Sequence, residues 1–148
     1  MARAIAIANP KGGVGKTTTV TNLGVALAEM QKETLLVDMD PQATLSAGLG
    51  LDGNALEETI YTALVDTEFS IDRVIHPIRE HLHLIPANID LASADMDLIA
   101  EIRREFLLSY LLKPLQSRYD FILIDCPPNL GLLPVNALCA SQEVLIPL

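Results

Sequence analysis

Residues 9–19, NPKGGVGKTTT, constrain the fold more than any other stretch, because they follow the apolar run AIAIA and carry three glycines. Glycine adopts backbone conformations that are closed to other residues, so Gly12, Gly13 and Gly15 allow successive backbone N–H groups to point toward one place. The residues from Lys16 onward have a helical pattern, and a helix N-terminus adds partial positive charge there. A strand, a glycine-rich turn and a helix in this order predict a loop that holds an anion.

Short apolar runs alternate with longer helical patterns along the rest of the chain, which is typical of a parallel sheet covered by helices. Continuous apolarity in TLLVDMD indicates a strand that is buried on both faces. We expect strands at 3–9, 34–40, 82–87, 119–125 and 143–148 and helices at 16–30, 56–65 and 94–115. The last helix should place Ile99, Ile102 and Phe106 on one apolar side.

The 148 residues, half of them hydrophobic, are enough for one compact domain. We therefore expect residues 1–148 to form a single α/β domain, with a mostly parallel sheet covered by helices on both faces. The chain ends on a strand, and an edge strand of a parallel sheet needs elements that cover its faces. We expect the domain to be truncated at its C-terminal end.

Charge and composition exclude several classes of protein. The net charge of −9 argues against a surface that attracts nucleic acid as a whole, and the basic pair Arg103 and Arg104 is flanked by glutamates. The apolar runs are too short to span a membrane, and the N-terminus lacks the features of a signal peptide. Cys126 and Cys139 have no CxxC spacing, so we expect reduced thiols in a cytoplasmic protein.

The glycine-rich loop has the residues that a nucleotide requires. Lys16 can reach the β- and γ-phosphates, and Thr17 can offer its hydroxyl to Mg²⁺, as in the P-loop pattern GxxxxGK followed by Ser or Thr. The six fixed residues of KGGxGKT would occur by chance on the order of once in 10⁷ positions. The match departs from the pattern at Pro10, where the first glycine should stand, and adds a second lysine, Lys11.

Three aspartates follow expected strands and are candidates for the metal and for catalysis. Asp38 and Asp40 are two residues apart and therefore share a face at the strand end where open α/β sheets bind ligands. Asp125 ends the apolar run FILI, a setting that typically delivers one carboxylate to Mg²⁺, usually through water. The alternatives are a turn cap before Pro41 for the first pair and an ordinary strand-end residue for Asp125.

Two weaker patterns have simpler interpretations. His81 and His83 lie two apart on an expected strand, but no third metal ligand accompanies them, so we predict no metal site there. Asp95 and Asp97 are interpreted as residues that favour the start of the helix at 94–115 through its dipole.

The sequence resembles a known family at these motifs. KGGVGKTTT is similar to the deviant Walker A motif of the ParA/MinD/Soj ATPases, relatives of the nitrogenase iron protein, and the resemblance continues through LLVDMDPQ, LIPANIDLA and YDFILIDCPPNLG. The partition branch, ParA/Soj, is the most similar. The resemblance implies a P-loop NTPase fold of the SIMIBI class that uses ATP or ADP with Mg²⁺. The implied nucleotide-binding residues are Lys11, Gly12, Gly13, Val14, Gly15, Lys16, Thr17 and Thr18, and the implied metal-site residues are Thr17, Asp38, Asp40 and Asp125.

The resemblance also implies a mechanism. The lysine that matches Lys11 crosses to the nucleotide of a second subunit, Lys16 contacts the phosphates of its own, and the aspartate that matches Asp40 positions the attacking water. Hydrolysis is thereby tied to an ATP-dependent homodimer, in which Gly12 allows the two loops to approach closely. The implied dimer binds DNA non-specifically, associates with the nucleoid, and is stimulated by a ParB-like partner to move chromosomes, plasmids or other cargo without binding a membrane.

Some features leave alternatives open. Ala43, Thr44 and Asn129 replace residues that are often Gly, Asn and Ser in the family, although none of the three is a phosphate or metal ligand. Family members are roughly 100 residues longer, so we expect this chain alone to bind DNA feebly or not at all and to turn over ATP weakly or not at all. The alternatives are a septum- or compartment-positioning ATPase of the same family and a nucleotide-binding scaffold without turnover.

Overall fold

The structure, a computed structural model, describes residues 1–9, 11–13 and 15–148. Within them the strands form one mixed sheet with the order β3-β4-β2-β5-β1-β6. Neighbouring strands run parallel except β3 and β4, which are antiparallel. The strands are β1 (Arg3–Ile7), β2 (Thr34–Asp38), β3 (His76–Arg79), β4 (Leu82–Ile85), β5 (Phe121–Asp125) and β6 (Glu143–Leu145).

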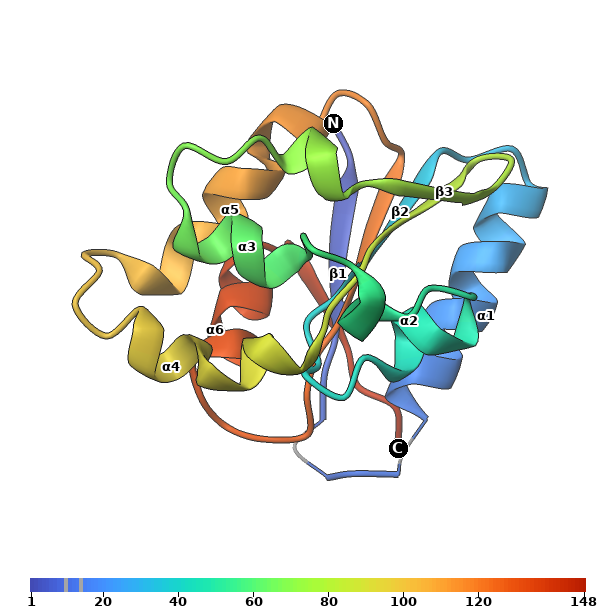
Figure 1. Ribbon diagram of the computed structural model, residues 1–148. Helices are drawn as coiled ribbons and strands as arrows, with labels where there is room; N and C mark the ends of the chain where they lie inside the picture. The colour runs from blue at the N-terminus through green and yellow to red at the C-terminus, as the bar shows by residue number, and fades with distance from the viewer. Residues whose placement is uncertain (10, 14) are drawn as a thin grey trace.

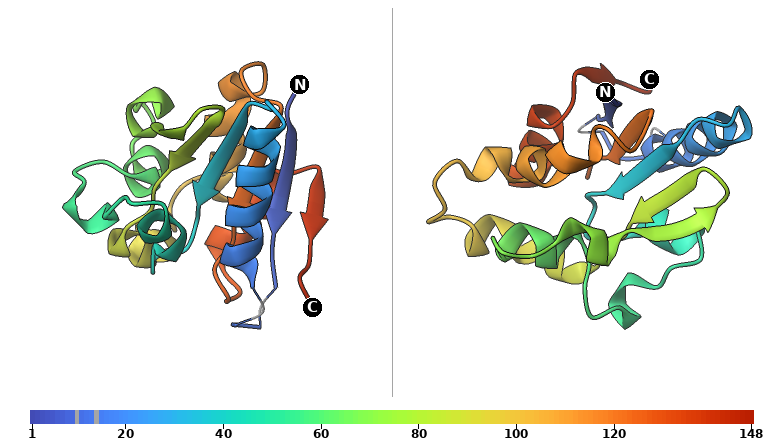
Figure 2. Two further views of the ribbon diagram at one scale, coloured as in Figure 1. Left: turned by 90° about the vertical axis from the view of Figure 1, so that its right-hand side faces the viewer. Right: turned by 90° about the horizontal axis from the view of Figure 1, so that it is seen from above.

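Helices cover both faces of this sheet, as Figures 1 and 2 show, which confirms the expected fold class. One face is covered by α1 (Lys16–Glu29) and α2 (Thr44–Gly48). The other is covered by α3 (Ile60–Val65), α4 (Ala94–Asp97), α5 (Leu107–Leu112) and α6 (Leu132–Cys139). Short 3-10 turns lie at Gly53–Ala55, Ile71–Val74, Ile89–Ser93, Arg104–Phe106 and Lys113–Leu115.

Alternation along each central strand divides the core into two layers. In β1, Ala4 and Ala6 pack in the layer beneath α3–α6, whereas Ile5 and Ile7 pack in the layer beneath α1. Every residue of β2 is buried, which confirms that its continuous apolarity indicates a strand covered on both sides. The sheet is therefore fixed from both faces, and the strand ends that carry the candidate aspartates are held rigidly.

The expected helix at 94–115 is wrong, because the structure breaks it between α4 and α5. Arg103 has a left-handed backbone conformation with φ 59°, which no continuous α-helix allows. The buried side chain of Asn136 on α6 donates to the carbonyl of Arg104 and accepts from the N–H of Leu108. These bonds satisfy backbone groups that a continuous helix would use itself. The expected apolar side is also wrong, since Ile99 and Ile102 are 67% and 88% exposed.

Other elements are shorter than expected or were not expected at all. The helix at 56–65 begins only at Ile60, because the Thr59 side chain accepts from the N–H of Tyr61 and caps it. The elements α2, β3 and α6 were not expected. The last of these contains Pro134 in its first turn, where a missing N–H costs no helical hydrogen bond.

Gly53 provides a test of the packing between the segment after α2 and the end of β4. A Cβ at this buried position would lie 1.8 Å from the carbonyl oxygen of Ala87, whereas a Cβ at Gly48 would meet no atom within 4 Å. We expect Gly53→Ala to lower the free energy of unfolding by about 3 kcal/mol, because backbone must shift to admit the methyl group. Gly48→Ala, at an exposed position in α2, should change it by less than about 1 kcal/mol. Urea denaturation measures both values, and equal midpoints for the two variants would contradict the packing described here.

Candidate nucleotide-binding site

Most of the predicted site residues meet where β1, β2 and β5 end. The register places Ile7 beside Asp125 and Asp38 on the other side of Asp125, so the glycine-rich loop after β1 and the two aspartate-bearing strands are neighbours. A depression of about 250 Å³ lies there. It is lined by Gly12, Gly13, Gly15, Lys16, Thr17, Thr18, Asp40 and Pro128. The predicted residue Val14 lies outside the described residues.

The glycine-rich loop adopts a conformation that depends on its glycines. Gly13 and Gly15 have φ values of 73° and 86°, in the left-handed region that L side chains rarely adopt. The loop is also braced by its own side chains, because the N–H of Lys11 donates to Asn9 Oδ1 at 2.9 Å. The loop leads directly into α1, because the N–H of Thr19 donates to the carbonyl of Gly15 at 2.9 Å. The glycines and Asn9 thus determine the backbone conformation of the loop at these positions.

The two lysines of the loop are placed differently. The Lys16 side chain is 7% exposed, and its Nζ donates to the carbonyl of Lys11 at 3.1 Å, so it folds back over the loop. Lys11 is exposed, and it takes part in none of the ion pairs among the described residues. One lysine side chain is therefore buried against the loop, and the other is exposed.

Asp125 is a buried carboxylate with one oxygen in use. Thr17 Oγ1 donates to its Oδ2 at 2.7 Å, whereas its buried Oδ1 has no hydrogen-bond partner among the described residues. Burial raises the pKa of Asp125 to about 7; repulsion from Asp38 and Asp40 adds to this effect, and Thr17 and Lys16 oppose it. A buried carboxylate and a neighbouring threonine hydroxyl are suitable ligands for a divalent cation. Such a cation would give Asp125 a positively charged partner.

Asp38 is placed as a brace within the fold. Its Oδ1 accepts from the N–H of Asp40 at 3.1 Å, and its Oδ2 accepts from the N–H and hydroxyl of Ser46 at 3.0 and 2.7 Å. Burial raises the pKa of Asp38 to about 6, against the opposing effect of these hydrogen bonds. Asp38 is not among the residues that line the depression, so its predicted metal role stays a prediction. Ser46 was not singled out from the sequence, because it belongs to no motif. Its hydroxyl also accepts from the N–H of Ala87.

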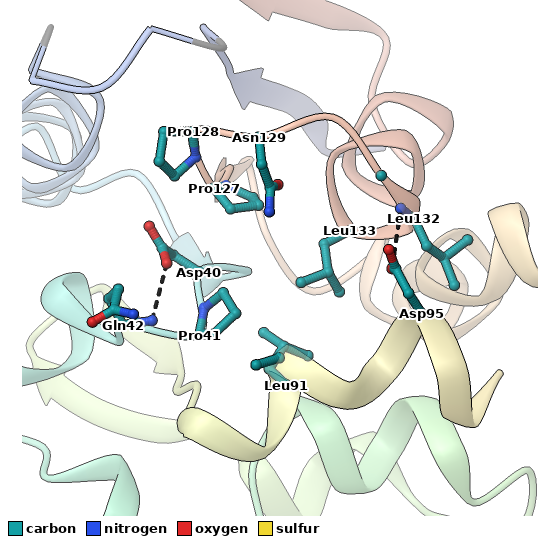
Figure 3. A pocket seen from close by; sticks show the side chains of 12 residues that line it. Asp40, Pro41, Gln42, Leu91, Asp95, Pro127, Pro128, Asn129, Leu132 and Leu133 are labelled. Atoms are coloured by element: carbon teal, nitrogen blue, oxygen red, sulfur yellow. Dashed lines mark hydrogen bonds between the residues drawn. The ribbon is translucent and has the colours of Figure 1, made fainter.

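Asp40 lies on the boundary between the depression and a neighbouring cavity of about 320 Å³ (Figure 3). Its Oδ1 accepts from the N–H of Gln42 at 3.0 Å, so the turn-capping alternative describes part of what it does. The residue is only half-buried, and its carboxylate points to the space between the loop after β2 and Pro128. It can therefore cap its turn and face a bound phosphate at the same time.

The weaker sequence patterns have structural partners. His81 lies in the turn before β4 and pairs with Glu33, and the ring of His83 packs edge-on against Tyr119. In the part of the chain that the structure describes, no group of three or more His, Cys, Asp or Glu side chains is arranged to hold a metal. A magnesium ion at Asp125 and Thr17 would therefore complete its coordination with phosphate and water oxygens, as is usual for this ion.

Asp95 and Asp97 act differently from the expectation that both favour the start of their own helix. They do occupy the first turn of α4. However, Asp95 accepts from the N–H of Leu132 at the start of α6, and Asp97 accepts from the hydroxyls of Tyr61 and Ser93. Both carboxylates thus connect separate segments, a role that sequence spacing does not reveal.

Comparison with known proteins identifies the family. The family model described as "AAA domain" matches residues 2–148. The chromosome partitioning protein ParA of Myxococcus xanthus is 49% identical over 99% of this chain and 52% of its own length. The sporulation initiation inhibitor protein Soj of Bacillus subtilis is also 49% identical, over 99% of this chain and 58% of its own length.

A solved structure has the same fold as this chain. Cobyrinic acid a,c-diamide synthase from Mycobacterium smegmatis, with bound ADP and magnesium, has a TM-score of 0.96 and 42% sequence identity, covering 100% of this chain and 60% of that one. This chain thus spans about half the length of the curated relatives it matches. Within the residues described, no helix is long and apolar enough to cross a membrane.

The AAA domain model matches nearly every residue, and ParA and Soj align with almost the whole chain at close to half identity. The chain therefore belongs to this family of P-loop ATPases, in the group that includes the partition proteins ParA and Soj.

Proposed function

We propose that this chain is the nucleotide-binding unit of an ATPase that binds ATP with Mg²⁺, hydrolyses it to ADP, and uses this cycle to partition chromosomes, plasmids or another cargo. The observation that carries the proposal is the buried Oδ1 of Asp125, which has no partner among the described residues and lies beside the Thr17 hydroxyl at the end of a glycine-rich loop. A buried carboxylate oxygen without a partner is costly unless a ligand completes the site.

Each residue then has a role that follows from its position. The amides of Gly13 and Gly15 and the N-terminus of α1 face the phosphates, and Lys16 supplies the charge that counters them. Thr17 and Asp125 would hold Mg²⁺, which screens the charge that develops on the transferred phosphoryl group. Asp40, at the open side of the depression, orients a water molecule for in-line attack. Positioning and charge compensation account for most catalysis of phosphoryl transfer.

The proposal includes a dimer in which Lys11 of one copy reaches the nucleotide of the other. Lys11 is exposed, so it is available to a second subunit. A Cβ at Gly12 would lie 3.9 Å from Pro128 Cβ, an ordinary contact distance, so nothing among the described residues of one chain requires glycine at this position. A requirement for glycine imposed by a second loop would account for it. A ParB-like partner that stimulates hydrolysis, and a cytoplasmic protein that joins the nucleoid when ATP is bound, complete the proposed cycle.

Lys16→Ala tests whether the loop binds a nucleotide. We expect the affinity for Mg-ATP to fall at least about a hundredfold, because a buried charge-assisted contact to phosphate is lost. Lys11→Ala should bind ATP nearly as well as the unmodified chain, since its proposed target lies on another subunit, and the exposed Lys32→Ala is the inert control. Titration calorimetry measures the three affinities. A Lys16→Ala variant that binds like Lys32→Ala would remove the nucleotide site.

Asp40→Ala separates binding from hydrolysis. We expect its affinity for Mg-ATP to stay within about threefold, and turnover to fall by about a hundredfold or more, because the attacking water loses its acceptor. In a full-length protein the ATP-bound dimer should then persist, which sedimentation velocity measures. Asp66→Ala is the matched control, since Asp66 also accepts the N–H of the residue two positions later but lies away from the depression. Normal turnover in Asp40→Ala excludes the role given to this carboxylate.

The acidic surface of this chain predicts weak DNA binding. With a net charge of −9, the 148 residues offer few cations to release counterions from a duplex. We expect fluorescence anisotropy with a random-sequence duplex to detect no saturable binding at about 0.15 M salt, with or without Mg-ATP. A tight complex that weakens steeply with added salt would show that these residues themselves carry a DNA-binding surface.

A further inference from the structure

The first turn of α6 is capped from a distant part of the chain. The first four N–H groups of any helix lack partners within the helix. In α6 the capping position is Gly131, which has no side chain to provide one. Instead the N–H of Leu132 donates to Asp95 Oδ1 at 3.2 Å, from a residue 37 positions earlier (Figure 3). The negative charge of Asp95 also suits the positive end of the α6 dipole.

The absence of a side chain at Gly131 is what lets this carboxylate approach. A Cβ built on Gly131 would lie only 3.0 Å from Asp95 Oδ2. One oxygen of Asp95 thus takes the helix N–H while the other lies against the bare backbone of the capping residue. A side chain at 131 would press on this oxygen, so the carboxylate would have to shift.

The capped turn ends the loop that leaves the metal-site strand. This loop, residues 126–131, runs from Asp125 at the end of β5 to the start of α6. Its Pro128 lines both the depression at the glycine-rich loop and the neighbouring cavity, where Asn129 also lies. The position of Pro128 beside the phosphate loop therefore depends on how both ends of 126–131 are held. Asp125 fixes one end, and Asp95 fixes the other.

The two segments that Asp95 joins are each held independently of it. The buried Asn136 donates to the carbonyls of Arg104 and Leu132 and accepts from Leu108, so α6 stays attached to the segment before α5. On the other side, the buried side chains of Ala94 and Leu98 hold α4 in the core. Loss of the Asp95 contact should therefore free the first turn of α6 and its loop without detaching either helix.

We propose that Asp95 is a positioning residue of the ATPase site: acting across the cavity, it fixes the start of α6 and thereby the loop that presents Pro128 and Asn129 beside Asp125 and the phosphate loop. This proposal rests on the proposed ATPase function. Asp95 thereby connects the segment after β4 to the loop 126–131, which follows Asp125. The connection consists of the hydrogen bond to Leu132 and the close contact with Gly131.

Four variants test the proposal, with Asp97→Ala as the control. Asp95→Ala removes the acceptor, and Asp95→Asn keeps an oxygen that can accept from Leu132 while removing the charge. Gly131→Ala leaves Asp95 in place but adds a methyl group 3.0 Å from its Oδ2, and it also strains the backbone at φ +159°, so Asp95→Ala is the decisive variant. Asp97→Ala removes a carboxylate from the same short helix that makes no contact with the loop. For each we would measure ATP turnover as separate kcat and KM values and amide hydrogen exchange in residues 126–133.

We expect Asp95→Ala and Gly131→Ala to lower kcat by about tenfold, because loss of one helix cap would raise the activation free energy by about the energy of that cap. KM for ATP should stay within about twofold. Exchange at 126–133 should speed up in both, while exchange in β5 and α1 stays unchanged. Asp95→Asn should restore most of kcat, and Asp97→Ala should match the unmodified chain. The proposal fails if Asp95→Ala matches Asp97→Ala in kcat and exchange, or if Asp95→Asn is as impaired as Asp95→Ala.

The exchange measurement keeps this test separate from the test of the ATPase itself. If the 148 residues alone show little or no turnover, as expected for a chain that spans about half the length of its relatives, the protection of 126–133 is still measurable. Faster exchange in Asp95→Ala and Gly131→Ala but not in Asp95→Asn or Asp97→Ala then supports the positioning contact. Unchanged exchange in all four variants overturns it whatever the turnover.

Discussion

The hydrogen bond between Thr17 and Asp125 is the interaction on which the arrangement of the site depends. It connects the first turn of α1 to the end of β5 and places the glycine-rich loop beside a buried carboxylate. Because β5 lies between β1 and β2, the same carboxylate neighbours Asp38 and feels the charge of Asp40. The buried Lys16 offsets part of this negative charge. The order of the strands thus brings Asp38 and Asp125 to neighbouring strand ends.

Local sequence carried enough information to predict the central sheet and the loop, for identifiable reasons. The conformation of Gly13 and Gly15 is set by the absence of a side chain, and the burial of β2 is set by unbroken apolarity; both properties belong to single residues or short runs. Asp125 was expected at a strand end because the apolar run FILI precedes it, and the structure places it there. These predictions required no knowledge of what packs against what.

The remainder could not be predicted because it depends on contacts between distant residues. The break at Arg103 is supported by hydrogen bonds from Asn136, more than 30 residues later, and helical periodicity in 94–115 gives no sign of them. In the same way, Asp95 has the spacing of a residue that starts its own helix, whereas its partner is Leu132. Ser46 looks like an ordinary small polar residue, yet it joins Asp38 to Ala87. Side-chain bonds to remote backbone leave no periodic signal in a sequence.

The brace formed by Asp38 and Ser46 has a consequence for the segment between them. Asp38 ends β2, and Ser46 lies in α2, so the intervening turn that carries Asp40 is held at both ends by the same carboxylate. Ordering one residue of free backbone costs about 1–2 kcal/mol of conformational entropy. Most of that cost is met when the chain folds, so Asp40 gives up little freedom when a nucleotide arrives. A ligand bound at this turn would therefore lose little of its binding energy to ordering the backbone.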